Sequence, residues 1–151
     1  MTILIRETKL TDLKAWSSLW QAYLSFYHSE NLAKSTSDLL WQRIHTLEHP
    51  IHCLVAQDAN KELVGLVHFF NHCDTWRKND VCYLEDLYVT AKNRNQGIGK
   101  ALIKAVYQQA IDNQWDKLYW HTKGDNRQAR ALYDQLTGGT DGFISYRLAT
   151  D

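Results

Sequence analysis

The stretch that decides the fold reads Tyr83-Leu84-Glu85-Asp86-Leu87-Tyr88-Val89, then residues 90–93, then Arg94-Asn95-Gln96-Gly97-Ile98-Gly99-Lys100. Its apolar and aromatic residues from Val81 to Val89 predict a β-strand. A helix is expected to begin around Gly97 to Gly99 and end near Asn113, because apolar residues recur there at helical spacing: Leu102, Ile103, Val106, Ala110 and Ile111. A strand therefore leads through a short basic loop into a helix start that contains glycine.

A helix start of this kind suits a diphosphate. Its first backbone N–H groups lack partners inside the helix, and the macrodipole adds partial positive charge. Gly97 and Gly99 allow close approach of the backbone to an anion, while Arg94 and Lys100 add charge. The dinucleotide pattern GxGxxG fails, because Leu102 stands where the third glycine belongs. The Walker A pattern fails as well, because Ala101 follows Gly99-Lys100.

The residues before this stretch predict two helices and an antiparallel hairpin. Residues 3–5 form a short strand pattern, and a helix follows that carries Leu13, Trp16, Leu19, Trp20, Tyr23, Phe26 and Tyr27 on one stripe, with Thr11 or Asp12 as cap. Ser35-x-x-Asp38 has the form of a capping box for a second helix that ends before Pro50. Residues 53–56 and 63–70 flank a turn at residues 58–61 and predict the hairpin.

The residues after the stretch predict a strand, a helix and a last strand. Residues 117–122 form a short aromatic strand pattern, and residues 126–136 form a helix that Gly138 terminates. Residues 143–148 alternate like a final strand. The order β-α-α-β-β-β-α-β-α-β predicts an α/β fold with a sheet of mixed direction.

Composition narrows the class of protein. The 151 residues fit a single domain, residues 1–151, and 17 basic residues balance 17 acidic ones, so no global positive field favours nucleic acid or an anionic membrane. The three cysteines are dispersed, which favours a reducing compartment: Cys53, Cys73 and Cys82. No signal-peptide core or membrane-spanning run is found, so we expect a cytoplasmic protein.

Two motifs resemble one family, the GNAT superfamily of N-acetyltransferases. Residues 94–99 match its acetyl-CoA signature Arg/Gln-x-x-Gly-x-Gly/Ala, and Asn126 to Tyr133 match its Asn-x-x-Ala-x-x-x-Tyr segment. The run from Tyr83 to Val89 is similar to spermidine/spermine acetyltransferases and related polyamine or histone acetyltransferases. The resemblance covers residues 81–136. Asn95 departs from the pattern, because many members have glycine there, and we expect a tighter or slightly shifted loop.

The resemblance implies a fold, an activity and a set of cofactor contacts. The fold is a GNAT-like mixed, mostly antiparallel sheet with helices on both faces. The activity is transfer of an acetyl group from acetyl-CoA to a primary amine of a polyamine, a lysine-like molecule or a basic protein tail, in a homodimer. The residues expected to contact acetyl-CoA are Leu87, Tyr88, Val89, Arg94, Asn95, Gln96, Gly97, Ile98, Gly99, Lys100, Asn126 and Ala129. Asn126 also fits a plain N-cap role.

The chemistry requires a neutral amine and a proton for the departing thiolate. An alkyl amine with a pKa of roughly 10.4 costs about 4–5 kcal/mol to present neutral at pH 7. The resemblance assigns Glu85 to amine deprotonation and Tyr133 to protonation of the thiolate. Strand alternation predicts that Asp86 faces away from Glu85, so that one of the two points into the cleft. The structural alternatives are an ordinary edge carboxylate for Glu85 and a core aromatic for Tyr133.

Amine binding involves aromatic candidates as well as the carboxylates. Glu85, Asp86, Phe26, Tyr27 and Trp120 are the predicted substrate contacts, although six tryptophans and eight tyrosines mostly belong in a core. His68, His72 and Cys73 lie close in sequence without a known metal-ligand spacing, so we predict no metal. No cysteine has a nucleophilic motif, which favours direct attack in a ternary complex. A non-catalytic CoA-binding module and a dinucleotide-binding module are the competing hypotheses.

Overall fold

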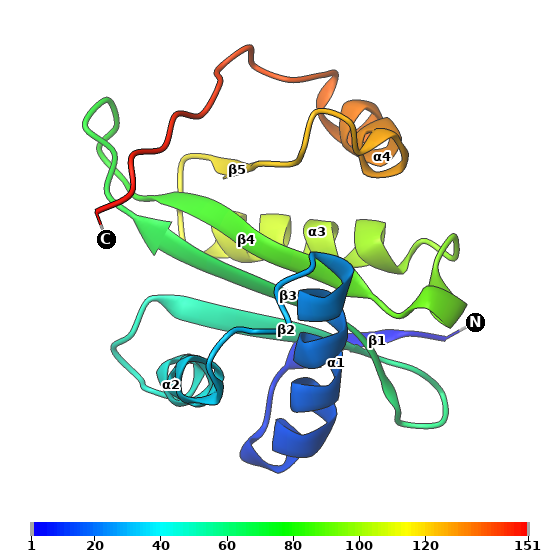
Figure 1. Ribbon diagram of the computed structural model, residues 1–151. Coiled ribbons are helices and arrows are strands. Elements are labelled where there is room, and N and C mark those ends of the chain that lie inside the picture. The colour runs from blue at the N-terminus through cyan, green and yellow to red at the C-terminus, as the bar shows by residue number, and fades with distance from the viewer. Residues whose placement is uncertain (1, 151) are drawn as a thin grey trace. The chain divides into compact units, whose positions relative to one another are not determined.

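The computed structural model describes residues 2–150, which separate into two compact units that meet after Trp120 in the chain (Figure 1). The first unit contains β1 (Leu4–Glu7), α1 (Leu13–Phe26), α2 (Lys34–Ile44), β2 (Ile51–Gln57), β3 (Leu63–His72), β4 (Val81–Val89), α3 (Ile98–Asp112) and β5 (Leu118–Trp120). The second contains α4 (Arg127–Thr137). The predicted helices and the first five strands are thus confirmed, with shifts of a few residues at their ends.

The five strands of the first unit form one sheet in the order β1-β2-β3-β4-β5. Neighbours from β1 to β4 pair antiparallel, while β4 and β5 pair parallel. The prediction of a mixed, mostly antiparallel sheet is confirmed. The β4–β5 ladder runs from Cys82 opposite Leu118 to Leu84 opposite Trp120. From Glu85 onward, β4 therefore has no strand beside it on this edge within residues 2–150.

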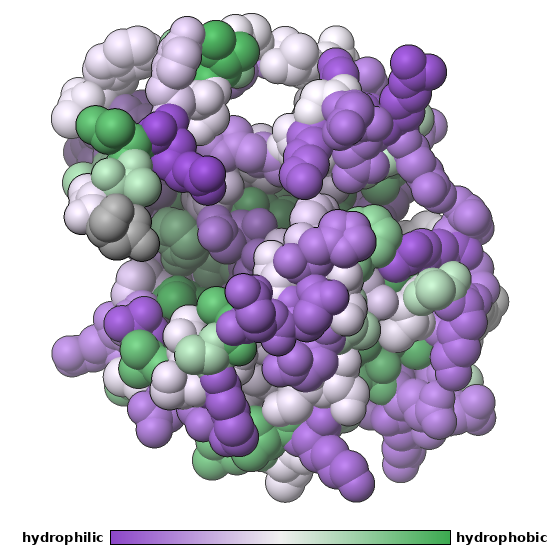
Figure 2. Space-filling view, in the orientation of Figure 1, coloured by the Kyte–Doolittle hydropathy of each residue, from purple (hydrophilic) through white to green (hydrophobic). Residues whose placement is uncertain are grey.

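Helices cover both faces of this sheet (Figure 1). On one face, α1 and α2 bury an aromatic cluster against β2 and β3 that includes Trp16, Trp20 and Trp41. On the other face, α3 buries Ile98, Leu102, Ile103, Val106 and Ala110. Gly65 of β3 makes this packing possible, because a Cβ there would lie 3.0 Å from the Tyr88 carbonyl oxygen and 3.2 Å from Leu102 Cδ1. Figure 2 shows that the outward side of the molecule around α1 is mostly hydrophilic, as an amphipathic helix requires.

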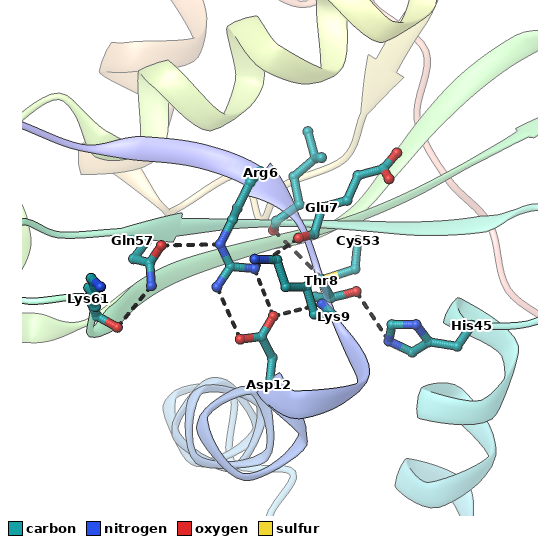
Figure 3. A network of polar contacts seen from close by, with 10 residues as sticks. Arg6, Glu7, Thr8, Lys9, Asp12, His45, Cys53, Gln57 and Lys61 are labelled. Atoms are coloured by element: carbon teal, nitrogen blue, oxygen red, sulfur yellow. Dashed lines mark hydrogen bonds and ion pairs between the residues drawn. The ribbon is translucent and has the colours of Figure 1, made fainter.

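A partly buried ion pair fixes β1 to the start of α1 (Figure 3). The Arg6 guanidinium donates two hydrogen bonds to the Asp12 carboxylate, at 2.8 and 3.1 Å, and a third from Nε to Gln57 Oε1 at 3.2 Å. Asp12 also accepts from the Lys9 N–H at 2.7 Å. Its side chain thus binds Arg6 and the preceding turn, and it makes no cap bond to α1 although Asp12 occupies the N-cap position.

Two local predictions are wrong. The Ser35-x-x-Asp38 capping box does not form, because α2 begins at Lys34 after Ala33 and Asp38 pairs with Lys34 at 2.8 Å instead. Residues 143–148 form no strand, and Phe143, Tyr146 and Leu148 are exposed. Alternation indicates which side chains share a face, but a strand also needs a neighbour whose N–H and C=O groups complete the ladder. These residues have no such neighbour in the part of the chain that the structure describes.

The second unit is organised around α4. The Asn126 side chain caps the helix by accepting from the Ala129 N–H at 3.4 Å, so its predicted N-cap role is confirmed. Gly138 ends the helix in the left-handed conformation with φ of 84°, as expected of a residue at this position. The prediction of one domain over residues 1–151 stays a prediction.

Candidate active site

A β-bulge in β4 lies at the predicted catalytic carboxylates. Asp86 pairs with His68 of β3, and the next pair toward the hairpin joins Leu84 to Phe69, which leaves Glu85 as the additional residue. A bulge interrupts the alternation of side chains along a strand. His68 and Phe70 lie on one face of β3, so their partners Asp86 and Tyr83 lie on that face as well. Glu85 follows Tyr83 by two residues and is hydrogen-bonded to it, so Glu85 shares this face and the prediction of opposite faces is wrong.

Both carboxylates raise the pKa of the same two tyrosines, Tyr23 and Tyr83. Burial and then Asp86 raise the pKa of Tyr23, and Glu85 adds to the effect. Burial and then Glu85 raise the pKa of Tyr83 to about 12, with a side-chain hydrogen bond to Glu85 and a smaller effect of Asp86. These shared effects agree with the register of the bulge, which places both carboxylates on one face of the strand. The bulge therefore brings Glu85 and Asp86 together.

The two carboxylates differ in their surroundings. Glu85 is exposed, whereas the Asp86 side chain is only 13% exposed. Asp86 Oδ1 accepts a 2.7 Å hydrogen bond from the Tyr23 hydroxyl of α1, and Asp86 Oδ2 lies 3.0 Å from His68 Nδ1 of β3. We call Tyr23, His68, Glu85 and Asp86 the bulge cluster. It pairs a fixed carboxylate with an accessible one.

The second predicted feature, residues 94–100, is called here the glycine turn. Gly97 is the N-cap of α3 with φ of 78°, a conformation that favours glycine, and it has no side chain with which to cap the helix. The internal hydrogen bonds of α3 begin with Ala101 N–H to Gly97 O at 3.0 Å, so the N–H groups of Ile98, Gly99 and Lys100 lie ahead of that ladder. No acidic residue occupies the first turn of α3.

Space around the glycine turn also suits an anion. A Cβ added at Gly97 would meet no heavy atom within 4 Å, and one at Gly99 would meet Val89 Cγ2 alone, at 3.9 Å. The packing of the described residues therefore does not require glycine at position 99, and the space that it leaves would admit an anion close to the backbone. Asn95 adopts φ of 61°, so the residue that replaces the family's usual glycine still takes the left-handed conformation.

Arg94 contacts the protein through part of its guanidinium. Its Nε donates to the Val89 carbonyl oxygen at 3.1 Å, and its Cζ lies 5.0 Å from the Phe26 ring centroid and 5.6 Å from that of Tyr88. Arg94 thereby connects the glycine turn to the end of α1 and to β4. A direct contact of Arg94 with a phosphate stays a prediction.

The predicted amine contacts are placed unequally in the first unit. Tyr27 packs against Tyr23 with ring centroids 4.9 Å apart, and burial followed by Asp86 raises the pKa of Tyr27, so this residue adjoins the bulge cluster. Phe26 already holds the Arg94 guanidinium against its ring. Trp120 ends β5 opposite Leu84, one residue before the bulge.

The remaining predicted residues belong to the second unit. Asn126 and Ala129 form the cap of α4, and Tyr133 lies in the same helix one turn after Ala129, with its carbonyl oxygen bonded to Thr137 Oγ1 at 2.8 Å. Their contribution to acetyl-CoA binding and proton transfer stays a prediction.

Competing sites elsewhere in the molecule are weaker. Within residues 2–150, no group of three or more His, Cys, Asp or Glu side chains could hold a metal ion, and no helix is long and apolar enough to cross a membrane. Two surface hollows of about 730 and 300 Å³ lie over α1 and between β1 and α3. Neither is lined by a predicted site residue, and neither contains a cluster of titratable groups like that at the bulge.

Comparison with known proteins decides the family. The Acetyltransferase (GNAT) family matches residues 14–138, which include the bulge, the glycine turn and α4. The chain belongs to this GNAT family. A D-amino-acid N-acetyltransferase of Saccharomyces cerevisiae, HPA3, is 28% identical to it over 96% of this chain and 90% of the yeast protein. The thialysine N-epsilon-acetyltransferase of Bos taurus is 34% identical over 56% of this chain and 54% of the bovine protein.

Solved structures agree on the fold of this GNAT protein. A probable acetyltransferase superposes with a TM-score of 0.85 at 22% identity, covering 100% of this chain and 99% of the other. Family membership and these N-acetyltransferase relatives make the chain an N-acetyltransferase.

Sequence reasoning missed three residues around the GNAT carboxylates: Trp16, Tyr23 and His68. Helical spacing predicts the first two on the apolar stripe of the first helix, and the spacing of His68, His72 and Cys73 predicts no metal site. One signal was available, because His68 interrupts an apolar strand that runs from Leu63 to Phe70. A polar residue at such a position requires a buried partner.

Proposed function

We propose that this GNAT protein transfers the acetyl group of acetyl-CoA to a primary amine by direct attack in a ternary complex. The glycine turn would bind the diphosphate, the backbone of Leu87 to Val89 would bind the pantetheine amides, and the bulge cluster would receive the amine. The observation that carries the proposal is the combination of an uncapped α3 N-terminus and paired carboxylates on the same strand-loop-helix segment.

The chemistry of the glycine turn fits a diphosphate. The N–H groups of Ile98, Gly99 and Lys100 precede the helical ladder, and the positive end of the α3 dipole lies there. The free space at Gly97 and Gly99 leaves room for the phosphate oxygens. Beyond Leu84, the edge of β4 that no described strand covers has backbone groups available for the amides of the carrier.

The bulge cluster fits a cationic acceptor. Asp86 holds hydrogen bonds to Tyr23 and His68 and provides a fixed negative charge, whereas exposed Glu85 can accept a proton from the amine directly or through water. Tyr133 would then protonate the departing CoA thiolate, since a phenol stays protonated at neutral pH. The amine nitrogen forms a bond to the acetyl carbon and the C–S bond of the thioester breaks. Of the two protons that the ammonium nitrogen loses, one passes to Glu85 and the other replaces the phenolic proton that Tyr133 gives to the thiolate.

Charge and the relatives support the proposed acceptor class. Two carboxylates with Tyr27 beside them favour a small cationic amine such as a polyamine or a lysine-like molecule. The named activities of the yeast and bovine relatives add D-amino acids and thialysine to the candidates. We further propose that the enzyme acts in the cytoplasm as a homodimer, on the strength of the family resemblance. Light scattering after size-exclusion chromatography measures that assembly.

The test is thiol release from acetyl-CoA with a panel of amines: spermidine, L-lysine, thialysine, a D-amino acid and a lysine-rich peptide. We expect turnover with at least one cationic acceptor, and mass spectrometry of the product identifies the acetylated nitrogen. Calorimetric binding of CoA without thiol release across the panel would favour a non-catalytic CoA-binding module. Binding of NAD in place of CoA would favour the dinucleotide hypothesis.

Tyr133→Phe separates the roles proposed for that residue. We expect a lower turnover number with nearly unchanged CoA affinity, because the ring is kept and the acidic proton is removed. A large loss of thermal stability in this variant would instead identify Tyr133 as a core aromatic.

A further inference from the structure

His68 is buried where a histidine is costly to place. Its side chain is 2% exposed, in a strand whose neighbouring residues are apolar, and among residues 2–150 the buried polar or charged residues are Ser37 and His68. Trp16 and Trp20 of α1 pack against the ring at centroid distances of 5.9 and 5.2 Å. A ring in such surroundings needs a partner for each nitrogen.

Both ring nitrogens have one. Nε2 lies 3.1 Å from the Trp16 indole nitrogen, and Nδ1 lies 3.0 Å from Asp86 Oδ2. The indole N–H can only donate, so Nε2 must accept and carries no proton. Nδ1 then holds the single ring proton and donates it to the carboxylate. The pair of partners selects one tautomer of the neutral ring.

A charged ring conflicts with this arrangement. Burial lowers the pKa of His68, but Cys53 and the hydrogen bond and charge of Asp86 outweigh burial and raise the pKa to about 10. The Trp16 contact opposes this charged ring, because an imidazolium would direct its Nε2–H at the indole N–H, donor against donor, at 3.1 Å. The hydrogen-bond geometry therefore favours the neutral ring, which does not cancel the charge of the Asp86 carboxylate.

We propose that neutral His68 is a positioning residue that holds the Asp86 carboxylate oriented at the amine end of the site. His68 and Tyr23 donate to different oxygens of that carboxylate, so the side chain cannot rotate without losing one of them. Trp16 acts one step further away, because it fixes the tautomer of His68. The inference rests on the proposed function in one respect, namely that Asp86 binds the acceptor amine.

The first test is independent of activity. Long-range nitrogen–proton NMR correlations distinguish a neutral ring, with one protonated and one unprotonated nitrogen, from an imidazolium with two protonated ones. The signal that disappears in His68→Asn identifies the residue among the seven histidines. We expect Nδ1–H and unprotonated Nε2 at pH 7. A doubly protonated ring, or a proton on Nε2, would overturn the proposal.

The second test uses two variants that each replace the ring by an amide near the position of one of its two nitrogens. In His68→Asn, the amide nitrogen takes the place of Nδ1 and still donates to Asp86. In His68→Gln, the amide lies near the position of Nε2 and retains the Trp16 contact instead. Both remove the ring, so their losses of stability are matched. We expect the KM for spermidine to rise tenfold or more in His68→Gln. In His68→Asn the KM should stay close to that of the wild type. In both variants kcat should change less than KM does in His68→Gln. Equal KM values would contradict a positioning role.

The third test changes the tautomer from a distance. Trp16→Phe removes the indole donor, so Nε2 becomes free to take a proton. The titratable groups facing the ring are Asp86 of β4, Cys53 of β2 and, through Asp86, Tyr23 of α1. We expect KM for spermidine to rise as the pH falls from 8 to 6 in this variant beyond any change in the wild type, because protonation reduces the charge of the His68–Asp86 pair from −1 to 0. A pH profile that matches the wild type would oppose the proposal.

Failure of this inference and failure of the proposed function give different results. If no amine is acetylated but NMR shows the Nδ1–H ring, the variants are compared by calorimetric binding of spermidine, and the positioning role stands or falls on that comparison. If amines are acetylated and the ring is an imidazolium, the transferase survives and the role of His68 does not.

Discussion

The bulge cluster and the glycine turn lie at the two ends of one strand-loop-helix segment, residues 85–100, and they are built in opposite ways. The bulge cluster takes its residues from α1, β3 and β4, is partly buried, and gives Asp86 partners on both oxygens. The glycine turn comes from seven consecutive residues, is open, and has helix N–H groups ahead of the ladder. A fixed charge suits the recognition of a small cation, whereas uncommitted donors suit a polyanion that provides its own acceptors.

The largest effect is expected at Glu85, the residue proposed to take a proton from the amine. Glu85→Gln keeps the shape and the acceptor oxygen toward Tyr83 but cannot take a proton, so kcat should fall by about 10²- to 10⁴-fold. Steady-state rates of thiol release measure it, and CoA affinity by calorimetry serves as the control. A variant with wild-type kcat would reduce Glu85 to an ordinary edge carboxylate.

A smaller effect is expected where the cluster only holds its shape. Tyr23→Phe removes one of two donors to Asp86, and a hydrogen bond to a charged group contributes about 1.5–3 kcal/mol. The KM for the amine should therefore rise by about 10- to 100-fold. Tyr107→Phe, at an exposed position of α3, is the matched control and should behave like the wild type. Identical KM values for the two variants would show that Asp86 does not depend on Tyr23.

Substitution of Gly99 in the glycine turn should change the affinity for CoA and leave the stability of the fold unchanged. A Cβ at position 99 makes only an ordinary contact with Val89, so Gly99→Ala should keep its melting temperature while CoA affinity falls by about tenfold, roughly 1.4 kcal/mol. Gly97→Ala should lose stability as well, by about 1 kcal/mol, because φ is 78° there. Unchanged CoA affinity in Gly99→Ala would remove the turn from the binding site.

The smallest effect on activity is expected at an ion pair outside both regions, where only the stability of the fold should change. Asp12→Asn should cost about 1–2 kcal/mol of unfolding free energy at pH 7 and leave kcat unchanged. The Arg6 hydrogen bond lowers the pKa of Asp12 below its ordinary value of about 3.9. The wild type should thus hold this stability above about pH 4 and lose it as the pH falls through the lowered pKa.

Denaturant unfolding of the wild type and the Asp12→Asn variant between pH 7 and pH 3 measures this difference. The two stabilities should converge at the acidic end, because the protonated carboxyl of Asp12 and the amide that replaces it are then both neutral. A difference that persists undiminished at low pH would assign the effect to the Lys9 N–H bond or to packing.

Prediction from sequence succeeded where the physics is local. The stripe of α3, the turn of the hairpin and the left-handed Gly138 follow from periodicity and backbone preference within a few residues. It failed where the outcome depends on which partner a side chain or strand finds. Asp38 pairs with Lys34 instead of capping α2, and residues 143–148 lack the neighbour that a strand requires in the part of the chain that the structure describes.

The amino-acid sequence by itself determined the glycine turn, because seven consecutive residues contain the glycines, the helix start and the charge that an anion site needs. It also determined that Glu85 and Asp86 are adjacent. Only the tertiary structure decided that they lie on one face of the strand, since the bulge against β3 shifts the alternation of β4. Tyr23 and His68 reach Asp86 across 63 and 18 residues of chain, and such hydrogen bonds exist only once helix and strands have packed.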